Sequence, residues 1–275
     1  MKKILATVAL FFALASTSAF ANDYKCDKKF IFFPGGPEGG PFGTIVYNGA
    51  VAAAEHTGCK VDYYWSQWNS EIMIKQFKEA VALQPDGIAI YGFPGDAAMR
   101  PIINEAIKKG IVITTMNTPL PDLEAELKTT GFGYAGADLF DAGFNLGKKG
   151  VEVCGLKAGD KAFIWGLASM PNRGERTKGA IAGVESMGVK VVYQEIPDNV
   201  NSDASQGTPM YVATYAANPD IKMAITDHGG LTASLPTYMK AAGHGTEAVC
   251  GAGFDLSAPI VDGINSGYID VVIDQ

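Results

Sequence analysis

The sequence contains few residues of the kinds that build metal centres and redox sites. Its three histidines, His56, His228 and His244, are scattered, and its four cysteines include no Cys-x-x-Cys pair and no set with zinc spacing. Ser169 lacks the flanking glycines of a nucleophile elbow. We therefore expect no metal and no cofactor, and the pattern does not favour an enzyme.

Basic residues and long apolar runs are also scarce. The chain has 22 Lys and Arg against 29 Asp and Glu, which disfavours nucleic acid and anionic membranes as partners. After residue 21, no apolar run approaches the about 20 residues that span a bilayer. We expect a soluble mature protein that binds no nucleic acid.

A secretory signal peptide is predicted over residues 1–21. Two lysines precede an apolar run over residues 4–15, and Ala19-Phe20-Ala21 is the small-x-small pattern of a cleavage site. Cys26 lies too far along to carry a lipid anchor. Without the signal, 20 basic and 29 acidic residues give a net charge of −9. We expect a periplasmic protein without a lipid anchor.

Four cysteines in an exported chain can pair in three ways, and an oxidising compartment favours pairing. Cys26 and Cys59 each lie just before a predicted strand, so they meet if these strands are adjacent and parallel. We favour the pairs Cys26–Cys59 and Cys154–Cys250. Buried free thiols are the alternative.

Short apolar strands alternate with amphipathic helices from residue 29 onward. Strands that are apolar on both faces and separated by helices predict a parallel sheet covered on both sides, and right-handed crossovers make it doubly wound. The first set consists of strands 30–33, 61–65, 87–91 and 111–116 and helices 44–57, 71–83 and 98–109.

A glycine-rich stretch over residues 131–136 separates this set from a similar one. Two α/β lobes joined by a hinge imply a ligand cleft between them that closes by hinge motion. We predict an N-terminal lobe over 25–134, a C-terminal lobe over 135–272, and the start of a last hinge crossover over 273–275. We expect the chain to be a fragment without its last helices. The second set consists of strands 162–166, 190–195, 222–226, 248–254 and 268–273 and helices 138–153, 176–187, 206–217, 231–242 and 257–265.

Polar side chains that can hold hydroxyl groups follow five of these strands. In open α/β sheets the ligand crevice lies beyond the carboxyl ends of the strands, so these side chains can converge there. Capping of the next helix is the alternative for the two aspartates. The residues are Asn117, Asp227, Asp255, Gln275, and Ser66-Gln67 after Trp65.

Aromatic residues accompany these strand ends. Trp65, Trp68 and Tyr91 lie at the carboxyl ends of the second and third strands. Aromatic faces pack against the C–H side of a sugar ring, although packing in the core explains any one of them equally well. The pattern indicates a site for a small polar ligand with an apolar face.

The chain resembles the type I periplasmic substrate-binding proteins of sugar ABC transporters, the ribose-binding-protein-like group, from about residue 28 to residue 275. The landmarks are Pro41-Phe42, Thr115-Met116-Asn117, Glu175-Arg176 through Gly179, Thr226-Asp227-His228, Gly253-Phe254-Asp255 and Ile273-Asp274-Gln275.

The resemblance implies roles for individual residues. Phe42 would stack on the sugar, and five polar residues would bind its hydroxyls, with Arg173 as the substitute for Arg176 if the loop register is shifted. Thr118 stands where ribose binders carry arginine, which argues against ribose. The five polar residues are Asn117, Arg176, Asp227, Asp255 and Gln275.

These features predict a binding protein that closes on a neutral sugar or polyol and delivers it to an ABC transporter permease in the membrane. A sensory receptor that presents its ligand to a chemoreceptor is the alternative. A secreted sugar-acting enzyme is a third interpretation, but it needs two carboxylates at a defined separation. Asp227 and Asp255 are better explained as hydroxyl acceptors.

Overall fold

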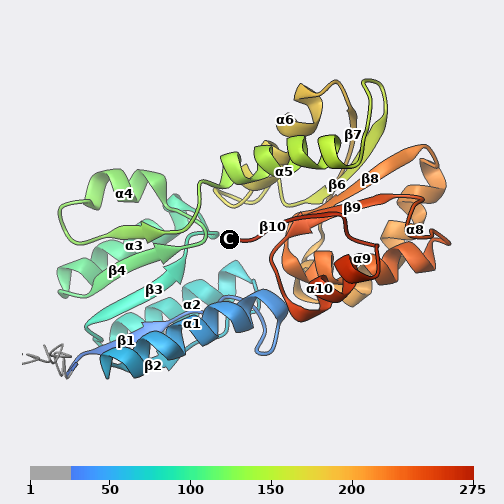
Figure 1. Cartoon of the computed structure of the whole chain (residues 1–275). Helices are drawn as coiled ribbons and strands as arrows, with labels where there is room; N and C mark the ends of the chain where they lie inside the picture. The colour runs from blue at the N-terminus through green and yellow to red at the C-terminus, as the bar shows by residue number, and fades with distance from the viewer. Residues whose placement is uncertain (1–25) are drawn as a thin grey trace, which may run out of the picture.

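A computed structural model describes residues 26–275 and contains two α/β lobes (Figure 1). The signal peptide predicted over residues 1–21 lies outside the described residues. Each lobe is built on one five-stranded sheet whose paired strands are all parallel. The predicted fold class is therefore confirmed. Within residues 26–275, no helix combines the length and apolar character that crossing a membrane requires.

The first sheet has the strand order β2-β1-β3-β4-β5. The chain moves outward from β1 to β2 and then returns past β1 to β3, so right-handed crossovers place helices on both faces. Ile31, Phe33 and Ile90 are fully buried in its core. The elements are β1 (Lys29–Phe32), α1 (Pro41–Thr57), β2 (Lys60–Tyr63), α2 (Ser70–Ala82), β3 (Gly87–Tyr91), α3 (Asp96–Lys108), β4 (Val112–Met116), α4 (Pro121–Leu127) and β5 (Gly133–Ala135).

The second sheet has the order β10-β9-β8-β6-β7, which repeats the path of the first from β6 onward. Two hydrophobic clusters pack on it, one with Trp165 and Tyr238 and one with Ile164 and Phe254. The elements are α5 (Leu139–Val153), β6 (Lys161–Gly166), α6 (Glu175–Ser186), β7 (Lys190–Glu195), α7 (Asp198–Ser202), η1 (Ala204–Gly207), α8 (Thr208–Ala217), β8 (Ile221–Thr226), α9 (Gly229–Ala241), β9 (Cys250–Phe254), α10 (Ala258–Asn265) and β10 (Val271–Ile273).

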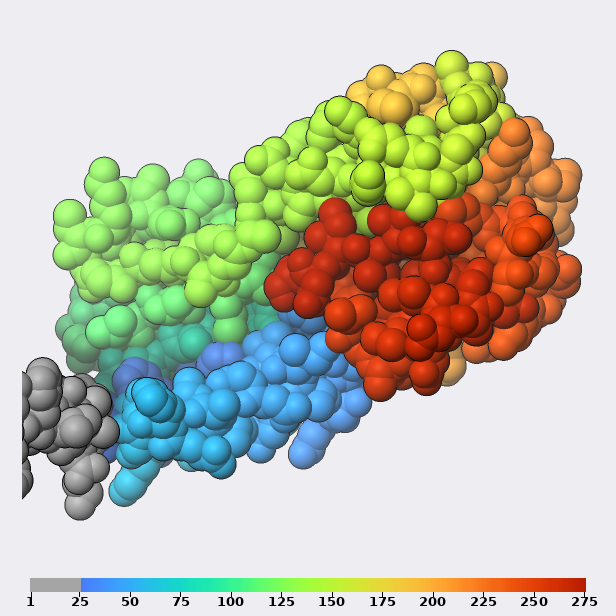
Figure 2. Space-filling model, viewed as in Figure 1, coloured from blue at the N-terminus to red at the C-terminus, as the bar shows by residue number. Residues whose placement is uncertain are grey.

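The dark red C-terminal residues lie where the second lobe meets the first (Figure 2). The end of β10 points from the second lobe toward the first (Figure 1). Gln275 and Asn117, which are 158 residues apart in sequence, form a hydrogen bond across this junction. The chain end therefore lies between the lobes, next to the carboxyl end of β4.

Two elements of the first lobe differ from the sequence prediction. The glycine-rich stretch over residues 131–136 contains the edge strand β5, which forms because Tyr134 pairs with Thr115 of β4. Gly133 and Ala135 are poor strand formers, so one tyrosine between them gives little local signal for a strand. The short helix α4 was also missed, although Pro121 is a favourable first residue for a helix.

The predicted starts of the last two strands are wrong. The backbone N–H of Ala248 donates to Gly245 O in a turn, so β9 begins only at Cys250. Tyr268 and Ile269 both donate to Gly263 O and complete the end of α10, so β10 begins only at Val271. The backbone N–H groups of Ala248, Tyr268 and Ile269 are thus hydrogen-bonded within a turn or a helix end and do not pair with a neighbouring strand.

Glycines allow α5 and α6 to pack unusually close together. Gly143 faces the backbone of α6, where a Cβ atom would overlap the carbonyl oxygen of Arg176. Gly179 faces the backbone of α5, where a Cβ atom would overlap the carbonyl oxygen of Phe140. Because Arg176 is in the first turn of α6, this contact helps to set the position of its side chain.

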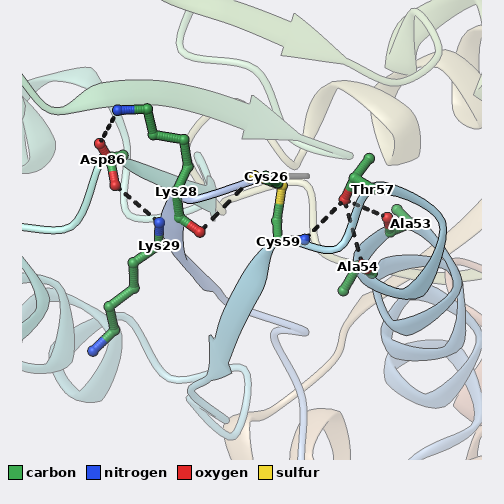
Figure 3. The surroundings of a disulfide bond; sticks show 8 residues. All are labelled: Cys26, Lys28, Lys29, Ala53, Ala54, Thr57, Cys59 and Asp86. Atoms are coloured by element: carbon green, nitrogen blue, oxygen red, sulfur yellow. Dashed lines mark hydrogen bonds and ion pairs between the residues drawn. A yellow bond between two sulfur atoms is a disulfide. The ribbon is translucent and has the colours of Figure 1, made fainter. Parts of the chain in front are cut away.

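The structure contains both favoured disulfides, Cys26–Cys59 and Cys154–Cys250. Cys26 and Cys59 lie next to the amino ends of β1 and β2, which are parallel neighbours (Figure 3). Close by, the backbone N–H of Lys29 donates to Asp86 Oδ2 at 2.9 Å. The first disulfide therefore joins two strand starts, and the second joins the end of α5 to the start of β9.

We expect the two disulfides to stabilise the protein unequally. They span 33 and 96 residues, and in the chain-entropy model the longer loop restricts the unfolded chain more. Replacing Cys154 and Cys250 by serine should therefore cost about 1 kcal/mol more than replacing Cys26 and Cys59. Urea unfolding of the two double variants measures the difference. A larger loss from the Cys26/Cys59 variant would contradict this expectation.

Candidate ligand-binding cleft

A cavity of about 310 Å³ lies between the two lobes, and both lobes line it. The first lobe contributes the loops after β1, β2, β3 and β4. The second contributes the loop before α6, residues 201–205, the start of α9, and residues after β9 and β10. Nearly all these segments follow the carboxyl end of a parallel strand, where ligands bind in open α/β sheets. The volume is within the range of small-molecule sites.

The wall from the first lobe is largely aromatic. Phe42, Trp68 and Tyr91 all line the cavity, as does Phe93. The Trp68 ring centroid lies 6.1 Å from that of Phe42 and 5.5 Å from that of Tyr91. The Tyr91 hydroxyl donates to Pro34 O at 3.2 Å and is buried, which raises its pKa. These contacts hold a rigid apolar surface against the cavity.

The structure does not place Trp65 in the cleft. Strand β2 ends at Tyr63, and the Trp65 ring packs against Tyr47 of α1 with 5.6 Å between the ring centroids. Trp68 takes the position in the cleft because Gln67 and Trp68 adopt a left-handed backbone, with φ of 58° and 54°. Trp65 does not line the cavity in this structure, because it lies before this turn and its ring packs on α1.

The wall from the second lobe is polar and internally hydrogen-bonded. Gln275 Oε1 accepts from Arg176 Nη1 at 2.7 Å and from Asn117 Nδ2 at 3.2 Å. Gln275 Nε2 donates to Asp255 Oδ1 at 2.7 Å, and Asp255 Oδ2 accepts from the N–H of Gly229 at 2.7 Å. Four residues predicted from separate strand and helix ends therefore form one network. All four line the cavity, as does Arg173.

Asp227 lies beneath the cavity wall instead of lining it. Its carboxylate accepts a hydrogen bond from Arg173 and another from Thr177 Oγ1 at 2.8 Å. Arg176 Nε lies 3.8 Å from Asp227 Oδ1. Asp227 does not line the cavity in this conformation, because Arg173, Arg176 and Thr177 surround its oxygens. Asp227 positions the arginines that do line the cavity.

Left-handed backbone conformations occur at residues of the cavity wall. Asn117 and Asp255, each directly after its strand, have φ values of 57° and 75°. This conformation is uncommon outside glycine and occurs where surrounding structure holds it, often at functional sites. It turns both side chains from the strand ends into the space between the lobes. The positions of Asn117 and Asp255 directly after their strands, together with their left-handed backbone, bring the two side chains to the cavity wall.

Several wall residues were not predicted from the sequence. Phe93 follows Tyr91 by two residues, so the alternation of a strand could have indicated it. Residues 201–205 span the end of α7 and the start of η1 and do not directly follow a strand, so the strand-end pattern does not indicate them. His228 lines the cavity and caps the start of α9.

Burial shifts the pKa values of the cleft residues. Burial raises the pKa of the Asp255 carboxyl more than Arg176 and Gln275 lower it. Burial lowers the pKa of Arg176 to about 10, so its guanidinium stays protonated at neutral pH. Burial also opposes ionisation of Asp227, but Arg173 and Arg176 outweigh it and keep that pKa below its usual value. The guanidinium of Arg176 and the carboxylate of Asp227 are therefore both charged at neutral pH.

We expect His228 to make the protein less stable in mild acid. Burial lowers its folded-state pKa to about 3, against 6.5 when unfolded. The unfolded chain therefore binds more protons between these values, so this contribution is complete above pH 6.5 and is lost as the pH falls. The slope should approach about 1.4 kcal/mol per pH unit.

Urea unfolding between pH 4.5 and 7.5 tests this, with His228→Asn as the matched variant because asparagine also caps helices. The pKa of His244 is also lowered by burial, so His244 also reduces stability in acid, in the wild type and in the variant alike. The variant should lose less stability than the wild type as the pH falls. Parallel pH profiles would contradict the assignment.

Fold and site together define a protein of the two-lobed α/β binding-protein class, with its cavity between the lobes. The chain belongs to the periplasmic binding protein domain family, whose model matches residues 31–275. This confirms the resemblance to type I periplasmic substrate-binding proteins of sugar transporters. No curated protein matches the sequence.

Solved structures with the same fold include sugar-binding proteins. GanP, a glucose-galactose binding protein from Geobacillus stearothermophilus, is 22% identical with a TM-score of 0.75, over 90% of this chain and 85% of that chain. An ABC transporter periplasmic solute binding protein from Actinobacillus succinogenes 130z with bound D-allose is 21% identical with a TM-score of 0.77, also over 90% and 85%. An Agrobacterium vitis solute binding protein with α-D-tagatopyranose is 22% identical with a TM-score of 0.76, over 90% and 83%.

Proposed function

We propose that this protein is exported to the periplasm, captures a neutral sugar or polyol between its lobes, and delivers it to the permease of an ABC transporter. The proposed lobes are residues 25–134 and 135–272. Closure stabilises the complex because the ligand contacts both lobes only in the closed form. The permease would then recognise the closed form.

One observation carries this proposal. The cavity has an aromatic wall on one side, with Phe42 and Trp68, and a polar wall on the other, with Arg176, Asp255 and Gln275. A sugar or polyol has the same two sides, an apolar C–H face and a rim of hydroxyls. Carboxylate and guanidinium groups form strong, charge-assisted hydrogen bonds with hydroxyls.

The charges near the cavity favour a neutral ligand. Arg173 and Arg176 balance Asp227 and Asp255 when all four are ionised. An ionic ligand would be left without a counter-charge in a buried site, which is costly. The sugars in the related solved structures, D-allose and α-D-tagatopyranose, are neutral and support the same ligand class.

We expect a thermal-shift screen to find a neutral carbohydrate. The probes are D-glucose, D-galactose, D-allose, D-arabinose, D-tagatose, myo-inositol and D-arabitol, with amino acids and sugar phosphates for comparison. At one hundred times its dissociation constant, a ligand should add about 2.7 kcal/mol of stability. Asp255→Ala should abolish the shift because it removes a buried acceptor.

Asp262→Ala is the matched control, since Asp262 is an exposed aspartate in α10, away from the cavity. It should leave the shift unchanged. Stabilisation by amino acids or sugar phosphates alone would refute the proposed ligand class. The same shift in Asp255→Ala would refute the proposed site.

A further inference from the structure

Three consecutive residues of the second lobe, Met170, Pro171 and Asn172, contact the first lobe. They lie in the loop between β6 and α6. The Met170 side chain packs against hydrophobic clusters of both lobes. Pro171 lies close to Gly95, where an added Cβ atom would be 2.9 Å from the Cβ atom of Pro171. The tip of this loop, residues 170–172, therefore extends from one lobe onto the other.

The side-chain amide of Asn172 joins the two lobes by two hydrogen bonds. Asn172 Nδ2 donates to Asp96 Oδ2 at 2.9 Å and to Pro119 O at 3.1 Å. Asp96 begins α3 and Pro119 lies between β4 and α4, so both acceptors belong to the first lobe. The amide has two N–H donors, and both are used. Hydrogen bonds to a carboxylate are stronger than those between neutral groups.

The first lobe holds both acceptors in place. Asp96 Oδ1 accepts from the backbone N–H of Leu123 at 3.0 Å, which fixes its carboxylate between α3 and α4. The carbonyl oxygen of Thr118 accepts from the N–H of Gly92 at 2.9 Å, which fixes the chain next to Pro119. These bonds lie within one lobe, so the two acceptors keep their positions when the lobes move.

The second lobe holds the donor in place. Ser169 Oγ donates to Glu195 Oε1 at 2.7 Å. At the start of the same loop, the N–H of Leu167 donates to Thr177 Oγ1 at 2.8 Å. Asn172 has a left-handed backbone with φ of 54°, which asparagine adopts more readily than most residues. The amide is therefore oriented before it meets the first lobe, and little conformational entropy is lost on contact.

These contacts are separate from the ligand cavity. Asn172, Asp96 and Pro119 do not line it, so their hydrogen bonds can form with or without a ligand. They cannot persist when the lobes separate, because a donor and an acceptor about 3.6 Å apart no longer form a hydrogen bond. The two bonds therefore stabilise only the conformation in which the lobes are together.

We propose that Asn172 is a latch between the lobes, which favours the closed form without a ligand and raises ligand affinity without contacting the ligand. A protein whose binding-competent form is only partly populated binds with an apparent affinity reduced by that fraction. Loss of the latch lowers the population of the closed form and therefore the affinity. The inference goes beyond the proposed function, because lobe closure can be measured with no ligand present.

Small-angle X-ray scattering without added ligand tests the latch, because the radius of gyration increases when the lobes separate. Asn172→Asp keeps the size of the side chain but directs a carboxylate toward Asp96, so repulsion should open the lobes. Asn172→Gly only removes the side chain, and glycine adopts the left-handed backbone without strain. We expect a larger radius in both variants, with the greater increase in Asn172→Asp. Thermal unfolding checks that each variant is folded.

Two further variants show whether the effect comes from this contact. Asn145→Asp is the matched control, since Asn145 is exposed in α5 and lines no part of the cavity. It should leave the radius unchanged. Adding Asp96→Asn to Asn172→Asp exchanges donor and acceptor, so the radius should return toward that of the wild type. A general loss of structure at Asn172 would not be rescued in this way.

Calorimetry with D-glucose, D-galactose and D-allose measures the effect on affinity. Any of these sugars that binds the wild type should bind Asn172→Gly about three- to tenfold more weakly. Equal radii of the wild type and Asn172→Asp would refute the latch, and so would equal affinities of the wild type and Asn172→Gly. The scattering result decides the latch even if none of the sugars binds, an outcome that counts against the proposed function alone.

Discussion

Gly143→Ala is expected to destabilise the protein by about 3 kcal/mol or more, at the upper end of the cost of overpacking a core. A methyl group at Gly143 would overlap the carbonyl oxygen of Arg176, which is backbone and cannot rotate away. The two helices must therefore separate. Since Arg176 is in the first turn of α6 and donates to Gln275, the separation should also weaken ligand binding. Urea unfolding and the thermal-shift screen measure the two effects.

Gly49→Ala provides the matched control. Gly49 lies within α1, is exposed, and has open space where a Cβ atom would be placed. Alanine is the better helix former, so this variant should gain about 0.5 to 1 kcal/mol. The same chemical change is thus expected to act with opposite sign at two helix positions. Stability of Gly143→Ala within 1 kcal/mol of the wild type would show that α5 and α6 can separate at little cost.

Asp227→Asn should cost about 3 to 5 kcal/mol, the usual loss when one partner of a buried ion pair is removed. The substitution keeps the size of the side chain and its capacity to accept from Thr177, but it leaves Arg173 and Arg176 without their shared counter-charge. Asp227 is only 3% exposed and Arg176 only 2%, so water cannot replace the lost partner. Chemical denaturation at neutral pH measures the loss.

Glu152→Gln is the control for the change of a carboxylate to an amide. Glu152 pairs with Lys149 at 3.4 Å in α5, and both side chains are exposed. Exposed pairs of this kind contribute about 0 to 1 kcal/mol, so the variant should be nearly neutral. An equal loss of stability in Asp227→Asn and Glu152→Gln would mean that Arg173 and Arg176 find other partners when Asp227 loses its charge.

Ligand binding should respond differently to Asp227 and Asp255. Asp255 lines the cavity, whereas Asp227 acts through the arginines. Asp255→Ala should therefore abolish binding in a folded protein. Asp227→Asn should weaken ligand binding only to the extent that it destabilises the second lobe. Comparison of the two variants separates a contact residue from a positioning residue.

The sequence by itself determined the alternation of strands and helices, the two parallel sheets, and the strand-end positions of Asn117, Asp255 and Gln275. These features depend on local patterns: apolar runs of strand length, helical periodicity, and the polar residue that ends each run. Parallel topology then places the ends of distant strands at one edge. The favoured disulfides followed from the same reasoning, because Cys26 and Cys59 precede neighbouring strands.

Only the tertiary structure decided which of these side chains reach the cavity. Trp65 and Trp68 are equivalent in the sequence, but the left-handed turn at Gln67 and Trp68 directs only Trp68 inward. Asp227 follows its strand as Asp255 does, but Arg173 and Arg176, which are 54 and 51 residues earlier in the chain, cover it. Local pattern sets where a residue lies along the chain. The direction of its side chain depends on partners distant in sequence, which only the folded structure brings together.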